Sequence, residues 1–234
     1  MRFIEKGREP SALRKFKRRN RETPELLRYE SIDRDTKDEL RKTLLDEQGY
    51  LCAYTMRPIA RTESPDFHVE HIRPQSENIA NELDYSNLVL CFGRQGLAET
   101  EWGAFRKGGA TVDERNFVSP LKRDCETRLT YGANGDIRAT SSSDEAALGA
   151  IALLALNHRA LRDARIAALR SRGLGPGASR PLTAAGAERE AERALERDNG
   201  GRLPAFCIAI KQVAERFARE SRKRSARLAR ERGD

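Results

Sequence analysis

The residue types best suited to catalysis lie together in the segment 67–74, which reads FHVEHIRP. Glu70 directly precedes His71 at the end of an apolar stretch, and Pro74 closes the stretch. A histidine titrates near neutral pH, at about 6.5, so it can take a proton from water. A carboxylate is the ligand that hard divalent cations prefer. The pair therefore predicts phosphodiester hydrolysis, with His71 as the base and Glu70 holding Mg²⁺ or Mn²⁺.

A second apolar stretch begins sixteen residues after His71, at Asn87. An amide side chain at this point can hold a histidine in one tautomer. Neighbouring side chains on a strand point to opposite faces, so a bend after His71 is needed if Glu70 and His71 are to reach one site. Asn87 is accordingly predicted to orient His71.

These residues must be positioned by two short strands, predicted at 67–72 and 87–92, with a polar loop between them. An amphipathic helix is predicted over 33–49, ending at Gly49. Helical patterns return over 146–172, with an interruption at residues 157 and 158, and then over 183–197 and 204–232. Gly and Pro residues mark a linker over 173–181.

The strand segments resemble those of the HNH nucleases, which have the ββα-metal fold. The motif of that family reads acid or His, then His-Ile-x-Pro, and later Asn-Leu on a second strand; here these are Glu70-His71-Ile72 with Pro74, and Asn87-Leu88. Further strings are similar to the HNH endonucleases found with retrons and in Septu-type anti-phage defence. They are CAY at 52–54, LDYSNL at 83–88, SPL at 119–121, YGANGDI at 131–137 and LNHRAL at 156–161.

The resemblance implies an α+β fold, with a small ββα-metal core and flanking helices on both sides. It implies an endonuclease that cuts nucleic acid, DNA being favoured, as the effector of a prokaryotic defence system. The implied partners are an ABC-type ATPase and a retron reverse transcriptase with its RNA–DNA. The expected division of the chain is a basic arm and helix at 1–49, the nuclease core at 50–110, a helical extension at 111–172 and a charged helical region at 173–234.

The sequence departs from the family pattern at two places. A structural zinc needs four ligands, and here only Cys52 and Cys91 remain of the expected thiols, so zinc is expected to be lost. Trp102 and Phe105 are expected to fill its place. The segment 99–109, after the second strand, lacks the usual His or Asn ligand, which leaves two glutamates to complete the metal site: Glu99 and, as the preferred choice, Glu101.

Three basic residues near the predicted site, Arg73, Arg106 and Lys107, are expected to grip phosphate. Charge is uneven along the chain of 234 residues, with a net charge of +5 over 1–44, −4 over 45–130 and +7 over 131–234. The basic flanks are therefore expected to meet nucleic acid. Phe16 lies within the basic block 14–21 and is a candidate for stacking on a base.

Composition excludes several classes of protein. No apolar run approaches the roughly 18 residues of a membrane span, and the first thirty residues lack the apolar core of a secretory signal. A cytoplasmic location and free thiols are therefore expected, with Cys125 and Cys207 buried. Two alternatives stay open: a degenerate HNH protein that binds nucleic acid or acts as a scaffold, and a basic helical binding protein with no nuclease ancestry.

Overall fold

A computed structural model describes residues 1–59, 66–74, 82–93, 101–180 and 182–232 of the chain. It contains helices and two small antiparallel sheets, in agreement with the expected α+β class. None of the helices described is long and apolar enough to cross a membrane.

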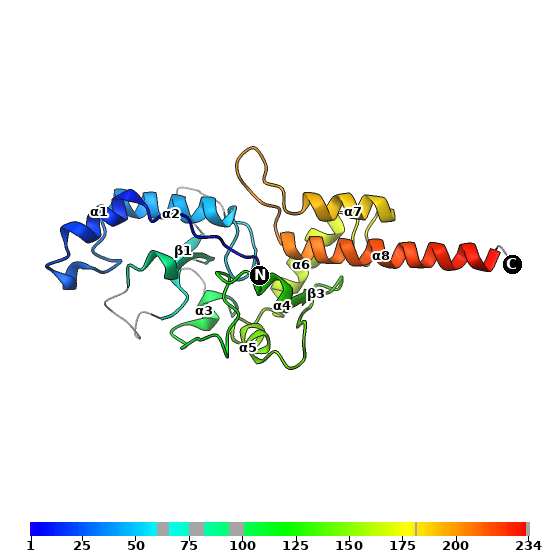
Figure 1. Ribbon diagram of the computed structural model, residues 1–234, viewed down its shortest axis with the longest axis horizontal. Coiled ribbons are helices and arrows are strands. Elements are labelled where there is room, and N and C mark those ends of the chain that lie inside the picture. The colour runs from blue at the N-terminus through cyan, green and yellow to red at the C-terminus, as the bar shows by residue number, and fades with distance from the viewer. Residues whose placement is uncertain (60–65, 75–81, 94–100, 181, 233–234) are drawn as a thin grey trace.

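The N-terminal part consists of helices packed beside the first sheet (Figure 1). Its elements are α1 (Ser11–Arg19), a 3₁₀ turn at Pro24–Leu26 and α2 (Arg34–Gln48). The side chain of Asp33 accepts the backbone N–H of Thr36 at the start of α2, and Gly49 ends the helix in the left-handed conformation, with φ of 61°. These are local signals, so the helix matches the sequence prediction closely.

The first sheet pairs β1 (Phe67–His71) with β2 (Leu88–Phe92) in an antiparallel register that places His71 opposite Leu88. A 3₁₀ turn (Tyr85–Asn87) leads into β2, and α3 (Ala104–Lys107) follows it. Both predicted strands are confirmed. The loop residues 75–81 and Glu99 lie outside the described residues.

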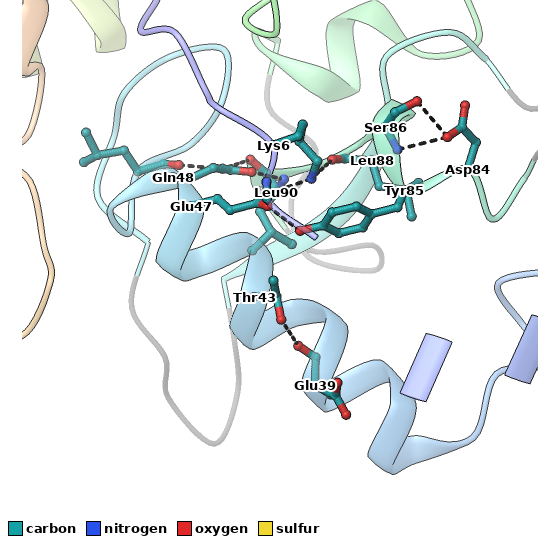
Figure 2. A network of polar contacts seen from close by, with 12 residues as sticks. Lys6, Glu39, Thr43, Glu47, Gln48, Asp84, Tyr85, Ser86, Leu88 and Leu90 are labelled. Carbon is teal, nitrogen blue, oxygen red and sulfur yellow. Dashed lines mark hydrogen bonds and ion pairs between the residues drawn. The ribbon is translucent and has the colours of Figure 1, made fainter. Parts of the chain in front are cut away.

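A buried amide fixes β2 to α2. Gln48, at the end of α2, donates to the carbonyls of Leu51 and Leu90 at 2.7 and 2.9 Å, and it accepts the N–H of Leu90 at 2.7 Å (Figure 2). Beside it, the carboxylate of Glu47 binds the ammonium of Lys6 at 2.7 Å and the hydroxyl of Tyr85 at 2.5 Å. Side chains of α2 therefore supply the hydrogen bonds that the outer edge of this small sheet would otherwise lack.

The second half of the chain is mainly helical. Its elements are α4 (Cys125–Arg128), β3 (Leu129–Tyr131), β4 (Ile137–Ala139), α5 (Glu145–Leu153), α6 (Arg159–Ser171), α7 (Ala184–Arg193) and α8 (Cys207–Arg232). The break between α5 and α6 contains the predicted interruption. The helix predicted over 183–197 is shorter and ends at Arg193, after which the N–H groups of Leu195 and Glu196 bond three residues back, to the carbonyls of Glu192 and Arg193. The side chain of Arg197 donates to the carbonyls of Asp46 and Gly201 at 2.7 and 2.8 Å.

The apolar side chains form two clusters. The larger one contains the first sheet, α2, α5 and the first residues of α8; the smaller one joins α7 to the middle of α8. All four cysteines are buried free thiols, as expected for Cys125 and Cys207. Phe16 was predicted to stack on a base, but it is only 6% exposed, because α1 turns it into the core beside α2.

Candidate functional site

The predicted base, His71, lies at the last position of β1 and is 9% exposed. Its Nε2 atom is 2.8 Å from the backbone carbonyl oxygen of Glu82. A carbonyl only accepts hydrogen bonds, so Nε2 carries the proton and Nδ1 is the basic nitrogen of the neutral ring. The backbone of the segment before β2 therefore selects one tautomer of His71.

The predicted metal ligand, Glu70, is part of a buried ionic cluster. Its Oε1 atom is 2.9 Å from Nζ of Lys107 and accepts a longer hydrogen bond, of 3.4 Å, from the hydroxyl of Tyr54. Its Oε2 atom lies 3.6 Å from Nε2 of His68. The Lys107 ammonium also donates to the carbonyl of His71 at 3.0 Å, and its side chain is only 1% exposed. The charge of Glu70 is thus balanced by a cation from α3.

Burial and charge raise the pKa values of two neighbours of Glu70, Tyr54 and His68. Burial is the main cause that raises the pKa of Tyr54, and the negative charge of Glu70 raises it further. Burial alone would lower the pKa of His68, but hydrogen bonds to Glu70 and to the carbonyl of Gly93 raise it overall. Both shifts favour protonated neighbours around an ionised Glu70.

Asn87 holds the turn that follows His71. Its Oδ1 accepts the N–H of Arg73 and its Nδ2 donates to the carbonyl of the same residue, both at 2.9 Å. The N–H of Ile72 donates to the carbonyl of Asn87 at 3.1 Å. Asn87 therefore positions His71 through the backbone of the next two residues.

The other predicted ligand, Glu101, is exposed and faces His158 at 3.4 Å. Within the described residues, no group of three or more His, Cys, Asp or Glu side chains is placed to hold a metal ion. Mg²⁺ is commonly bound by one or two carboxylates together with water and substrate phosphate. Glu70 fits a cation of that kind, which would bind with the substrate and compete with Lys107.

The three residues predicted to grip phosphate differ in accessibility. Arg73 and Arg106 are exposed. Lys107 is buried against Glu70, so it cannot reach a phosphate in this conformation, and its predicted role is corrected to an internal counter-ion. The sequence could not show this, because the burial of Lys107 depends on how α3 packs against β1.

An open groove of about 800 Å³ adjoins the turn after His71. Ile72, Arg73 and Asn87 line one side. The segment 112–128 lines the rest and contributes basic and acidic side chains, including Lys122, Arg123, Arg128, Asp113 and Glu114. This segment was not predicted as part of the site, since it carries no motif beyond the short SPL string.

Cys52 and Cys91, the two thiols that remain of the expected structural zinc site, lie together in the core. Burial by itself would raise the pKa of Cys52, but hydrogen bonds from Cys91, the backbone of Phe92 and Thr55 outweigh it and lower the pKa to about 6. Burial raises the pKa of Cys91. These two thiols provide half of the four ligands that a structural zinc takes.

Aromatic side chains pack near this pair. Trp102 stacks on Phe92, with ring centroids 5.5 Å apart, and Phe105 lies 5.2 Å from His68. His68 itself is 2.7 Å from the carbonyl of Gly93, so it joins the end of the hairpin to the aromatic packing.

Comparison of the sequence with protein-family models and with curated proteins finds no match.

Proposed function

We propose that this chain is an HNH-type endonuclease that hydrolyses phosphodiester bonds of nucleic acid, with DNA as the favoured substrate. The observation that carries the proposal is the hydrogen bond from Nε2 of His71 to the carbonyl of Glu82. It fixes the tautomer of His71, and Lys107 joins this residue to Glu70 by donating to the His71 carbonyl and to the Glu70 carboxylate. A small antiparallel hairpin followed by a short helix, with Asn87 clamping the turn, is the arrangement expected from the sequence resemblance.

In the proposed reaction, His71 takes a proton from water as the water oxygen bonds to phosphorus. The bond from phosphorus to the leaving oxygen then breaks, and that oxygen takes a proton from solvent. A divalent cation, when bound, would neutralise charge on the phosphate and on the leaving oxygen. Glu70 would hold this cation, Asn87 would keep the turn in place, and the exposed Arg73 and Arg106 would contact the flanking phosphates.

The biological setting is part of the same proposal and rests on the sequence resemblance alone. It is a prokaryotic anti-phage system in which the nuclease works with an ABC-type ATPase, with or without a retron reverse transcriptase and its RNA–DNA. The partner would supply the trigger, because an unregulated nuclease would damage its own host.

A second candidate is a catalytically degenerate HNH protein that binds nucleic acid or acts as a scaffold without cutting. One observation favours it: the buried ammonium of Lys107 lies 2.9 Å from the carboxylate that the metal would need. An internal cation that cannot leave would make Glu70 a structural residue. The two candidates share a fold and differ in whether Lys107 gives way to a divalent cation.

Cleavage assays distinguish the active nuclease from the degenerate protein. Plasmid and linear duplex DNA are incubated with the purified chain in Mg²⁺, Mn²⁺ or EDTA, with and without the product of any neighbouring ATPase gene. The nuclease proposal predicts cation-dependent cleavage that is lost in His71→Ala and retained in His158→Asn, a matched histidine variant at the N-cap of α6. Cleavage that persists in His71→Ala would refute the role of His71. Binding of DNA without cleavage of DNA, RNA or tRNA under any of these conditions would support the degenerate protein.

A further inference from the structure

The last part of α8 projects away from the rest of the molecule. Figure 1 shows α8 running beside α7 and then continuing alone to the C-terminal end. Ala218 is the last buried residue of the helix. Residues 219–231, here called the α8 arm, are exposed apart from the half-buried Ser221. Because the buried part of α8 has already formed the helix, the arm can continue it without a new nucleation cost.

The α8 arm has six basic and two acidic residues among those thirteen positions. With about 100° between successive residues, Arg219, Lys223 and Arg230 fall within about 40° of one another around the helix. Arg222 flanks this stripe on one edge and Arg227 on the other, and the two acids, Glu220 and Glu231, lie just beyond Arg227. The arm therefore presents one strongly basic face.

Few of these charges are used within the chain. Arg222 binds Glu188 of α7 at 2.6 Å, and Arg227 binds Glu231 at 2.7 Å. Arg219, Lys223 and Arg230 make no ion pair with the part of the chain that the structure describes. Like charges four residues apart, such as Arg219 and Lys223, disfavour a helix by about 0.2–0.5 kcal/mol per pair. Repulsion within the stripe therefore lowers the stability of the helix in the free protein, and a bound polyanion would reduce this repulsion.

The alternatives to a polyanion need an apolar face, and the α8 arm lacks one. A coiled coil requires apolar residues at a 3.5-residue spacing, and an interfacial membrane helix requires a broad apolar side. The arm contains one large apolar residue, Leu228, and two alanines. Duplex DNA carries about one negative charge per 1.7 Å of axis, and Arg219 to Arg230 span about 16 Å of helix.

We infer that the α8 arm binds the phosphate backbone of nucleic acid, independently of base sequence, through Arg219, Lys223 and Arg230. This surface is separate from the His71 site, and it would hold the nucleic acid that the proposed nuclease cuts. The inference rests on the proposed function only for the identity of the polyanion. Its test measures binding, so its failure can be told apart from a failure of the proposed catalysis.

The test uses the full chain and a fluorescein-labelled random-sequence DNA duplex, with anisotropy measured over a range of KCl concentrations. The arm variant combines Arg219→Gln, Lys223→Gln and Arg230→Gln. Each phosphate contact contributes about 0.9 to the slope of log K against log salt, so the slope should fall by about 3 in magnitude. The dissociation constant at about 0.15 M salt should rise at least tenfold, while the melting temperature stays unchanged.

The matched control removes the same net charge from exposed sites on other elements, through Lys42→Gln, Arg138→Gln and Arg159→Gln. It should change the dissociation constant less than threefold. Equal weakening in both variants, or no change in the arm variant, would overturn the inference. So would a wild-type chain that binds no duplex but binds vesicles with 30% phosphatidylserine through the arm.

Discussion

Replacing Lys107 by Met tests the internal ion pair on which the choice between cutting and not cutting depends. Methionine keeps most of the volume and removes the ammonium. The side chain of Lys107 is 1% exposed and donates to Glu70 and to the carbonyl of His71. Removing one partner of a buried pair costs about 3–5 kcal/mol, because the other charge stays buried. Glu70 is 14% exposed and keeps contacts with Tyr54 and His68, so we expect the lower end, about 3 kcal/mol.

The assay is denaturant and thermal unfolding in EDTA at pH 7.5. For a chain of this length each kcal/mol shifts the melting temperature by about 2–4 °C, so Lys107→Met should melt about 6–12 °C lower. Glu70→Gln combined with Lys107→Met removes both charges and should recover about 2 kcal/mol relative to the sum of the single variants. A loss below about 1 kcal/mol in Lys107→Met, or simple additivity, would refute the description of this pair as a coupled buried unit.

The same variant shows whether a divalent cation can replace the ammonium. If Mg²⁺ binds beside Glu70 in Lys107→Met with a dissociation constant of about 1 mM, 10 mM Mg²⁺ should stabilise that variant by about 1.4 kcal/mol. Glu70→Gln combined with Lys107→Met is the control and should gain nothing. Stabilisation of the wild type by Mg²⁺ would show that Lys107 gives way without mutation, as the nuclease requires.

Three further predictions concern the hairpin. Asn87→Ala removes both hydrogen bonds to the Arg73 backbone, so it should lower stability by about 1–2 kcal/mol and reduce cleavage more than DNA binding, measured by unfolding and by cleavage at saturating DNA. Gln48→Leu leaves the buried N–H of Leu90 without its partner and should cost about 3 kcal/mol, seen as a lower denaturation midpoint. Folding lowers the pKa of Cys52 from 9.0 to about 6, so the free energy of unfolding should rise with pH between these values and fall as the pH drops through 6. Unfolding measured at pH 6 and at pH 8.5 should show a smaller difference in Cys52→Ser than in the wild type.

The elements set by local signals were predictable from sequence. Asp33 and Gly49 mark the two ends of α2. Both could be recognised because a side-chain cap and a left-handed glycine depend only on neighbouring residues. The two strands of the hairpin were predictable because their apolar runs are short and bounded by polar residues. By contrast, the contact of Arg197 with the carbonyl of Asp46 was not predictable, because the two residues are more than 140 positions apart in sequence and no local pattern contains both.

The candidate site divides in the same way. Glu70, His71 and Asn87 were identified because the order of residue types follows a motif. Their partners were not, because the carbonyl of Glu82, the ammonium of Lys107 and the groove-lining segment come from packing between distant parts of the chain. Lys107 was assigned to phosphate because it follows Arg106 in a basic pair near the predicted site. Only the docking of α3 on β1 turns it inward.

The electrostatics of the site and of the α8 arm favour a division of labour between them. A carboxylate already paired with a buried ammonium adds little negative field for substrate to overcome, but it also attracts a divalent cation weakly. A cation that binds poorly by itself gains affinity when a substrate phosphate completes its ligands. The basic stripe of the α8 arm would raise the local concentration of that phosphate without occupying the site. A weak metal site and a polyanion surface would therefore reinforce each other in the proposed nuclease, which would act only on nucleic acid already held.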